Sequence, residues 1–416
     1  MIFNLIVLFL LIFSFPIAGP LNSAYAALVL ALGKIALEHK INNLSKYFSS
    51  SYIKILLLST LVITLFCSFW TIAFGVSDYS LTAAYLSLLI GIILCVTVFA
   101  SLSDECIDKD YMERLVINVF VIQAIISIAA FISPGFREFV HRFQFQHDAE
   151  MADASYSGIR GLAISGRLYF EFAATCGLVI FIQFKRIIND DKAKYLEYIK
   201  LFLIIICGFF AGRTSLIGIA FGFVYLAVCH KPLRFKLQIV VKFVSVISIL
   251  IALFLLVLPK DILDFISERL LPWVFDLFIK YFENGSVDGS ASFNSLNEDY
   301  QFINISTEEW IIGSGIYCNP DGSYYRYIDG GYLRQILYWG IIGSIASTLY
   351  SVLYFIRPFK RTSESDYQWF VFLAFVLTMV FQYKGDMSSI SRFYHVVLIL
   401  IFLPATLKRQ TIAKRI

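Results

Sequence analysis

The stretch Ser80–Ala100, SLTAAYLSLLIGIILCVTVFA, runs for 21 residues without a charged side chain. A run of this length and composition can cross the hydrocarbon core of a bilayer as a helix. Across the 416 residues, 59% are hydrophobic and only 15% are charged, whereas soluble domains carry about 25% charge. The sequence therefore predicts an all-α polytopic integral membrane protein with a single membrane domain, residues 1–416. Twelve apolar runs are expected to form transmembrane helices: 3–18, 21–37, 53–74, 80–100, 115–133, 168–184, 197–211, 215–229, 239–258, 333–356, 367–383 and 393–407.

The basic residues are shared unevenly between the two sides of this predicted bundle. With the N-terminus in the cytoplasm, 22 of the 34 Lys and Arg residues fall on the inner side and 12 on the outer side. Because basic loops stay in the cytoplasm, both termini are predicted to be cytoplasmic. Two long loops then face outward, toward the periplasm of a Gram-negative cell: 134–167 and the large loop 259–332.

The large loop opens with an amphipathic pattern. Its charged residues recur at nearly helical spacing among Leu, Ile and Phe, which predicts a helix lying on the membrane surface and kinked near Pro272. A helix that merely packs on other helices is the alternative. The charged positions are Asp261, Asp264, Glu268, Asp276 and Lys280.

The outer basic residues are biased in type. Nine of the 12 are Arg, whereas only 7 of the 22 inner ones are Arg. Membrane topology needs positive charge and is indifferent to its carrier, so the bias indicates a use for the planar guanidinium fork. That fork binds phosphate or pyrophosphate oxygens in pairs. Chance, combined with ordinary salt bridges to outer acids, is the alternative.

Arg213 is the sharpest case, because it separates two short apolar runs in FFAGRTSLIG, residues 209–218. An arginine at membrane depth is costly and indicates a functional site. Its neighbours Gly212, Thr214 and Ser215 would present backbone amides to an anion at a helix start. The alternative is an arginine that reaches up to the outer headgroups.

Arg160 and Arg167 precede the predicted helix 168–184, and Glu171 lies about one turn inside it. We expect all three residues to belong to the substrate-binding region. Glu171 either pairs with one of these arginines or serves as a base, and pairing is favoured.

Residues 313–334, GSGIYCNPDGSYYRYIDGGYLR, form the polar end of the large loop. Glycines allow a backbone to approach a ligand closely, and tyrosines offer an apolar ring with a polar tip that suits a sugar. Asp329 and Arg334 straddle a predicted helix start, which offers free amides and a positive dipole end. We expect pyrophosphate near Arg334, with Asp329 as base or orienting group for an acceptor hydroxyl. A structural Asp329–Arg334 pair is the alternative. The tyrosines expected along the sugar path are Tyr324, Tyr325, Tyr327 and Tyr332.

Several other chemistries find no support in the sequence. The net charge of +4 is too small to argue for nucleic acid as a partner. The seven cysteines are scattered and form no C-x-x-C pair, so neither a metal site nor a disulfide framework is expected. Nothing resembles a phosphate-binding Walker loop, so ATP is not expected to supply energy. No cofactor is predicted.

The segment 211–218, AGRTSLIG, resembles a short motif of bacterial O-antigen polymerases of the Wzy type and of the related O-antigen ligases. The turn 311–315, IIGSG, followed by DGGYLR at 329–334 and LYWGIIG at 337–343, is similar to the end of the large loop in that family. Arg160-Gly161 before a helix also fits, as does the overall topology.

The resemblance implies a GT-C-like glycosyltransferase of the bacterial inner membrane whose active site faces the periplasm. Such an enzyme is a metal-independent polymerase that moves the growing glycan from undecaprenyl pyrophosphate to the next undecaprenyl-pyrophosphate-linked oligosaccharide unit. The implied roles are catalysis by Asp329, Arg213 and Arg334, and pyrophosphate binding by Arg160, Arg213 and Arg334. Membrane lipid and a chain-length regulator protein are the implied partners.

One departure from the family bears on the choice between its members. Ligases place a His near the position of Asp329, whereas the loop 259–332 contains none. This favours a polymerase over a ligase. A lipid-linked oligosaccharide flippase or another transporter is the alternative of a different class, since it would also need about twelve helices. Such proteins usually place charges at mid-helix around a central cavity.

Overall fold

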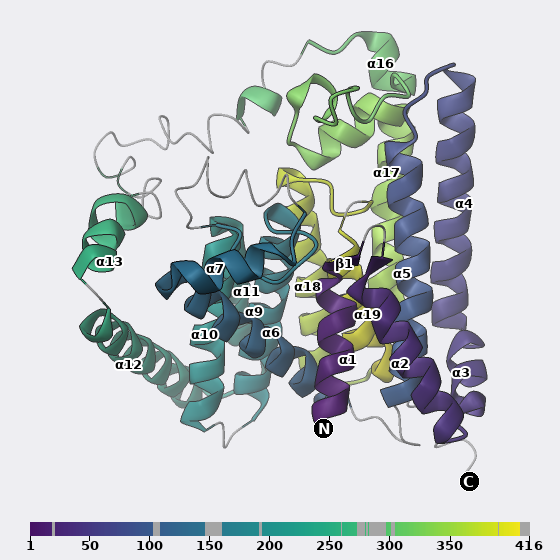
Figure 1. Cartoon of the computed structure of the whole chain (residues 1–416). Coiled ribbons are helices and arrows are strands. Elements are labelled where there is room, and N and C mark those ends of the chain that lie inside the picture. The colour runs from purple at the N-terminus through teal and green to yellow at the C-terminus, as the bar shows by residue number, and fades with distance from the viewer. Residues whose placement is uncertain are drawn as a thin grey trace.

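The computed structural model describes residues 1–18, 21–102, 109–145, 160–190, 194–258, 260–272, 279, 282, 297–300, 304–389 and 391–407. Within these residues the chain is almost entirely helical (Figure 1). The long elements, in order, are α1 (Ile2–Phe13), α2 (Ser23–Leu37), α4 (Ser51–Ala73), α5 (Ser80–Leu102), α6 (Lys109–Ile132), α9 (Phe170–Asn189), α10 (Tyr195–Ala211), α11 (Ile217–Val228), α12 (Leu233–Val257), α17 (Gly331–Arg361), α18 (Ser365–Lys384) and α19 (Arg392–Leu407).

Each of the twelve predicted apolar runs contains one of these helices, so the all-α character of a membrane protein is confirmed. Among the described residues, five helices are long and apolar enough to cross a membrane: α4, α5, α6, α12 and α17. Shorter apolar helices cover four other runs. The number of crossings and the GT-C-like fold remain predictions.

The first two runs differ from the expectation of two full-length helices. α1 and α2 contain 12 and 15 residues and are joined by a two-stranded antiparallel ribbon, β1 (Pro16–Ala18) with β2 (Leu21–Asn22). At 1.5 Å per residue each helix is roughly 18–23 Å long, short of the ~30 Å hydrocarbon core. The side chain of Asn22 begins α2 by accepting a hydrogen bond from the Ala24 amide.

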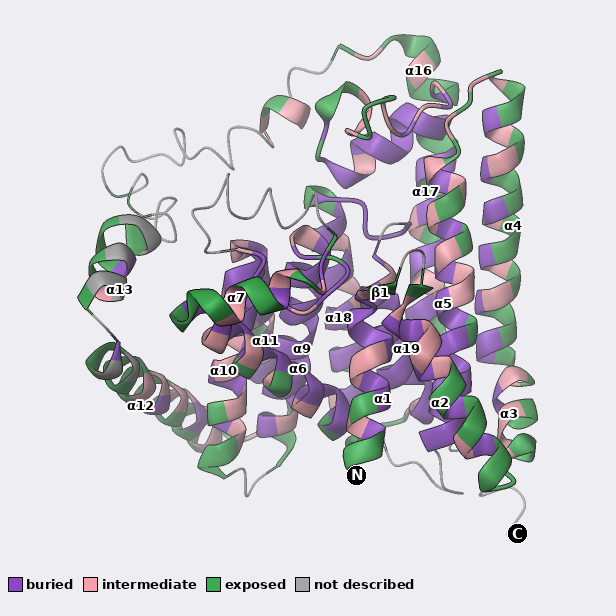
Figure 2. Cartoon of the chain, in the orientation of Figure 1, coloured by how far each residue is buried: buried purple, intermediate pink, exposed green. Residues whose placement is uncertain are grey.

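The buried centre of the bundle is formed by α9 and α19, in which nearly every described side chain is buried (Figure 2). Glycines bring α9 and α11 into direct backbone contact. A Cβ on Gly218 would lie 2.1 Å from the Gly177 carbonyl oxygen, and one on Gly222 would lie 2.4 Å from the Phe184 ring. Small residues allow this close approach inside membranes, where burial in lipid does not drive helices together.

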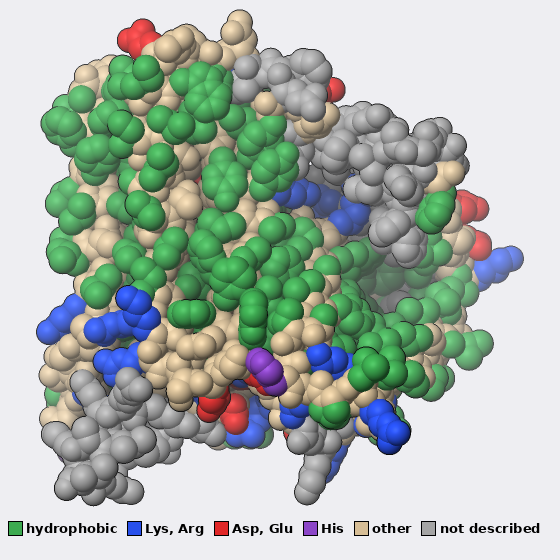
Figure 3. All heavy atoms as spheres, turned by 180° about the vertical axis from the view of Figure 1, so that it is seen from behind, with side chains coloured by type: hydrophobic (Ala, Val, Ile, Leu, Met, Phe, Trp, Pro, Cys, Tyr) green, Lys and Arg blue, Asp and Glu red, His purple; other side chains and the backbone are tan. Residues whose placement is uncertain are grey.

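The outer surface carries the apolar belt expected of a membrane protein. Figure 3 shows hydrophobic side chains over most of one face, with Lys and Arg side chains along its lower part and a further group of them higher on the same face. α12 is largely exposed along its whole length (Figure 2). This pattern suits a bundle whose outer faces contact lipid.

Both predicted outer loops contain short helices. Ser133 caps α7 (Pro134–His141), an unpredicted helix within the first loop. The predicted amphipathic segment forms α13 (Lys260–Phe265) and the π-helix η2 (Ile266–Leu270), and its later part, including Asp276 and Lys280, lies outside the described residues. The shorter helices α3 (Ile41–Phe48) and α16 (Thr307–Ile312) and the 3-10 turns η1 (Arg213–Leu216) and η3 (Tyr325–Tyr327) complete the named elements.

Candidate functional site

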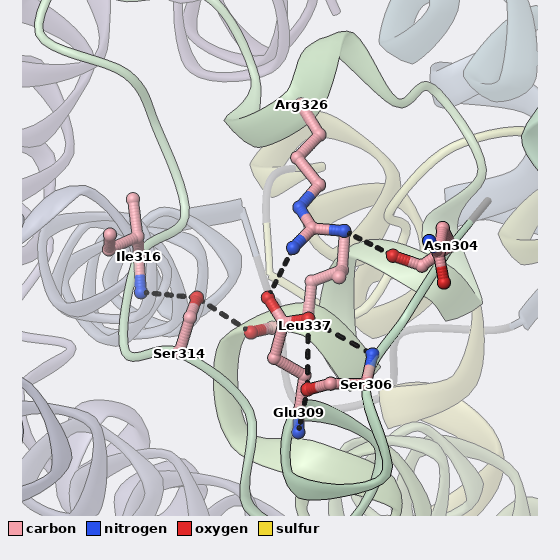
Figure 4. A network of polar contacts seen from close by, with 7 residues as sticks. All are labelled: Asn304, Ser306, Glu309, Ser314, Ile316, Arg326 and Leu337. Atoms are coloured by element: carbon pink, nitrogen blue, oxygen red, sulfur yellow. Dashed lines mark hydrogen bonds and ion pairs between the residues drawn. The ribbon is translucent and has the colours of Figure 1, made fainter.

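The site is built around a break in α17. At Trp339 and Gly340 the backbone leaves the helical region, and Gly340 takes φ +74°. The freed carbonyls of Leu337 and Tyr338 accept hydrogen bonds from the amides of Ser314 and Gly315, at 2.7 and 2.8 Å. Figure 4 shows the side chain of Ser314 bonded to the same Leu337 carbonyl.

The glycines at this break contact protein backbone, which differs from the predicted use in approaching a ligand. A Cβ on Gly313 would lie 2.4 Å from the Tyr338 backbone, and one on Gly340 would lie 2.0 Å from the Ile311 carbonyl oxygen. Both glycines have positive φ, which other residues rarely adopt. The motif residues of the loop end and of α17 therefore fit one another, and together they fix the start of α17.

Asp78, in the turn between α4 and α5, anchors the loop end from the other side. Its carboxylate accepts hydrogen bonds from the amides of Tyr317 and Cys318, at 2.5 and 2.7 Å, and from the amide and hydroxyl of Ser80. Burial opposes ionisation here, but the hydrogen bonds outweigh it and lower the pKa of Asp78. The segment near Tyr317 is thus tied to a long membrane helix pair.

Arg326 helps to hold the end of the large loop in place. Its guanidinium donates to Glu309 at 2.5 Å and to the carbonyl of Asn304 at 2.8 Å (Figure 4). Glu309 also closes a capping box with Ser306 at the start of α16. This outer arginine serves structure, as the salt-bridge alternative to phosphate binding expects.

Arg334 has a different environment although it lies eight residues further on. The residue is only 4% exposed, and its guanidinium carbon lies 4.5 Å from the Tyr317 ring centroid and 3.3 Å from that of Tyr324. Its Nε and Nη2 atoms are buried and find no hydrogen-bond partner among the described residues. Buried N–H groups are normally satisfied, so an anionic ligand that reached this position would supply the partners that these two donors lack.

Asp386, which sequence reasoning missed, is the polar hub behind Arg334. It is 1% exposed and lies in the turn between α18 and α19. It accepts hydrogen bonds from the side chains of Tyr317 (2.8 Å), Gln335, Gln382 (3.3 Å), Ser388 (2.7 Å) and Ser389 (2.5 Å), and from the Ser388 amide. Asp386 also interacts electrostatically with Arg334. The only sequence signal was an acid, in KGDMSS at 384–389, between two apolar runs.

Asp329 lies beside Arg334 but, among the described residues, forms no ion pair with it. The amides of Asp329 and Gly330, expected to face pyrophosphate, donate instead to the Asp299 carboxylate at 3.0 and 3.3 Å. A carboxylate therefore occupies the anion position at the start of α17. Burial and the neighbouring Asp299 charge raise the pKa of Asp329, while Arg334 and Lys384 act in the opposite direction.

Lys384, at the end of α18, joins the site to the predicted arginines of other segments. Its ammonium group interacts electrostatically with Arg160 and Arg213, which repel it, and with Asp329, which attracts it. Electrostatic interactions thus connect Lys384 with three groups from distant parts of the sequence. Sequence reasoning counted Lys384 among the outer basic residues but did not assign it to the site.

Arg213 begins the short turn η1, between α10 and α11. Here the expected free amides are partly used, because the amide and hydroxyl of Ser215 both bond to the Gly212 carbonyl, at 3.1 and 2.9 Å. The turn packs closely on α9, since a Cβ on Gly177 would lie 3.2 Å from the Ser215 carbonyl oxygen. Arg213 therefore lies at the junction of α10 and α11, in a turn that packs closely on α9.

The remaining predicted residues are placed as follows. Glu171 pairs with Arg167 at 3.7 Å, the favoured one of its two predicted roles. The Tyr332 hydroxyl donates to the Met379 carbonyl at 3.2 Å, and Tyr325 lies 5.5 Å from the Arg326 guanidinium. Of the predicted sugar-path tyrosines, Tyr324 contacts Arg334, and Tyr327 is 73% exposed.

A separate cavity of about 690 Å³ lies at the opposite end of α9 and α18. Charged side chains line it, among them Lys109, Lys185 and Asp366. Lys185 forms a buried ion pair with Glu113, with Nζ–O distances of 2.6 and 2.8 Å. This cavity shares no lining residue with the site around Arg334.

Compared with known proteins, the sequence matches no family model and no curated protein. Within the part of the chain that the structure describes, no group of three or more His, Cys, Asp or Glu residues could hold a metal ion.

Proposed function

We propose that this chain is an O-antigen polymerase of the bacterial inner membrane, which joins lipid-linked oligosaccharide units at the periplasmic face. The observation that carries the proposal is the buried Arg334, whose Nε and Nη2 have no hydrogen-bond partner among the described residues. Asp329 interacts electrostatically with both Arg334 and Lys384, and Lys384 interacts in turn with Arg160 and Arg213. A site of this kind suits a pyrophosphate group, because guanidinium groups bind its oxygens in pairs.

The chemistry follows from what a pyrophosphate leaving group requires. The acceptor sugar's hydroxyl oxygen attacks C1 of the donor glycan, and the C1–O bond to pyrophosphate breaks with its electron pair leaving on the phosphate oxygen. Negative charge grows on that oxygen in the transition state. Cations already fixed in place stabilise this charge more than they stabilise the bound substrate, and only such differential binding accelerates the step.

Asp329 is proposed to take the proton that the attacking hydroxyl loses. Its carboxylate lies within electrostatic range of both Arg334 and Lys384, and its pKa is raised by burial and by Asp299. A carboxylate with a raised pKa is a better proton acceptor near neutral pH than an ordinary aspartate. The acceptor substrate then lies on the Asp329 side of the cations and the leaving group on the Arg334 side.

The decisive experiment compares two arginines of the same segment. Arg334→Lys keeps the positive charge but loses the fork, and we expect polymer formation to fall by about tenfold to a hundredfold, the effect of one strong charge-assisted hydrogen bond. Arg326→Lys is the matched control and is expected to lower thermal stability while retaining polymer formation per molecule of protein. The measurement is the ratio of polymer to single lipid-linked units on gels, at equal protein levels. Normal polymer in Arg334→Lys would refute the proposal.

A lipid-linked oligosaccharide flippase is the second candidate, favoured by the charged 690 Å³ cavity at the opposite end of the helices. The two functions separate in the same experiment. A polymerase variant still delivers single units to the periplasmic side and loses only the polymer, whereas a flippase variant loses both products.

The proposed orientation has its own test. Tyr327 is 73% exposed at the outer end of the molecule, so Tyr327→Cys in a Cys318→Ser background should react with a membrane-impermeant thiol reagent in intact spheroplasts. Labelling that requires cell lysis would place this end of the molecule in the cytoplasm.

A further inference from the structure

Asp386 is linked to the Arg334 guanidinium through a single intermediate side chain, Tyr317. The Tyr317 hydroxyl donates to Asp386 at 2.8 Å, and the ring of the same tyrosine lies 4.5 Å from the Arg334 guanidinium carbon. Tyr317 is only 3% exposed. The position of the ring against Arg334 is thus set from its far end by the carboxylate.

This link strengthens and orients the contact between ring and cation. A hydroxyl that donates to a carboxylate polarises its ring toward greater electron density, and a cation near such a ring is held more firmly. Tyr324, 3.3 Å from the same guanidinium, supplies a second ring. With two rings fixing the guanidinium, Nε and Nη2 keep one direction while they remain unpartnered among the described residues.

Direct chemistry by Asp386 itself is unfavourable. Both of its oxygens already accept hydrogen bonds from several donors, and the residue is 1% exposed. A base needs a free lone pair in reach of the proton that it removes. Its donors come from α17, from α18, from the turn that follows α18 and from the loop end, so it joins the parts that surround Arg334.

We propose that Asp386 is a positioning residue that acts through Tyr317 to aim the buried N–H groups of Arg334 at the anionic group of the substrate. The inference rests on the proposed function only in taking that anion to be a phosphate or pyrophosphate. It adds Asp386 to the site and states how it acts, through the Tyr317 side chain.

A purely electrostatic role and a positioning role for Asp386 predict opposite effects of Asp386→Asn on anion binding. Removing a negative charge near Arg334 would, by electrostatics alone, make an anion bind more tightly. Loss of the held geometry makes the anion bind more weakly. The variant should fold, because Gln335 Oε1 is unpartnered among the described residues and can accept a hydrogen bond from the new amide.

The test measures binding of inorganic pyrophosphate to the purified full-length protein, through its thermal stabilisation over a range of concentrations. We expect Asp386→Asn and Tyr317→Phe each to weaken binding by about tenfold, the effect of one hydrogen bond to a charged group. The double variant should be no weaker than the weaker single variant, because both changes cut the same link. Tyr394→Phe is the matched control: it removes another buried tyrosine hydroxyl, bonded to Thr378 at 2.8 Å on α18, and should bind as wild type.

Each outcome decides the matter. Equal or tighter binding in Asp386→Asn, unchanged binding in Tyr317→Phe, or a double variant whose loss is the product of the two single losses overturns the positioning role. If Asp386→Asn does not accumulate, Tyr317→Phe decides alone, since it leaves the carboxylate in place. Stabilisation that survives Arg334→Gln shows that the anion binds elsewhere, which overturns both the proposed function of Arg334 and this inference. Stabilisation that is lost in Arg334→Gln but kept in Tyr317→Phe overturns this inference alone.

Discussion

Charged side chains cluster at both ends of the helix bundle, but the neighbours of these side chains differ between the two ends. At the end that carries the 690 Å³ cavity, several lining side chains have partners of opposite charge within the protein, although the buried Nη1 of Arg186 has no hydrogen-bond partner among the described residues. Lys185 is paired with Glu113 at 2.6 Å, and Lys109 with Glu364 at 3.1 Å. The His230 ring, likewise, lies 2.7 Å from Asp366.

At the other end, like charges are brought close together. Lys384 experiences repulsion from Arg160 and Arg213. Arg334 is buried against tyrosine rings, and two of its donors have no hydrogen-bond partner among the described residues. Folding does not place cations together unless something compensates the cost. Within the described residues Asp329 attracts Lys384 and Asp386 interacts with Arg334, and under the proposed function a substrate anion offsets the remaining repulsion at this end.

The largest expected effect comes from breaking an ion pair at the cavity end of the bundle. Lys185→Met leaves Glu113, which is fully buried, without its partner. Removing one member of a buried pair costs about 3–5 kcal/mol, so we expect a large fall in thermal stability and in protein level. Thermal unfolding of the purified protein measures the effect.

The control for this prediction removes both charges. Lys185→Met combined with Glu113→Leu should recover most of the lost stability, because hydrophobic replacements of a buried pair are often neutral. A double variant as unstable as the single one would show that Lys185 acts through other contacts, such as its approach to the Phe370 ring at 5.2 Å.

The second prediction concerns the gathered cations. Arg213→Lys keeps the charge of the cluster but loses the planar fork, and we expect polymer formation to fall by at least about tenfold with little change in stability. Arg137→Lys is the matched control, because Arg137 bonds to backbone carbonyls of Ala130 and Phe131 at 3.3 and 3.4 Å. Near-normal polymer in Arg213→Lys would identify Arg213 as a membrane anchor.

The smallest expected effect is a shift in the pH dependence of the polymerisation rate. The pKa of Asp329 is raised, so a reaction that needs its ionised form should decline on acidification at a higher pH than an ordinary aspartate would cause. Asp299→Asn removes one cause of the rise, so the decline should move to lower pH. Initial polymerisation rates between about pH 4 and 8 measure it. An unchanged profile in Asp299→Asn would exclude Asp329 as the base.

Much of the fold could be predicted because the membrane imposes strict rules on sequence. All twelve apolar runs contain helices, and Ser80–Leu102 coincides with the stretch that first indicated a membrane protein. The prediction erred where helices are short or broken. The hydrophobic pattern of 3–37 could not reveal a ribbon between two half-length helices, nor did the apolar run 333–356 reveal the break at Gly340.

The candidate site, like the fold, could be predicted only in part from the sequence. Composition was enough to single out Arg213, Asp329 and Arg334, because charge is conspicuous in an apolar chain. It favoured Arg334 over Arg326 from its place at a predicted helix start, and the structure shows that the two arginines differ in partners and in burial. It did not select Asp386, whose surroundings come from several distant segments.

The sequence by itself determined that this chain is a helical membrane protein, and it predicts that Arg outnumbers Lys among the basic residues of one side. Hydrophobicity and charge act locally and leave their pattern in the order of residues. Only the tertiary structure decided which charged side chains lie next to one another. Pairing depends on distances between side chains far apart in the sequence, and the packing of α9, α17 and α18 sets those distances.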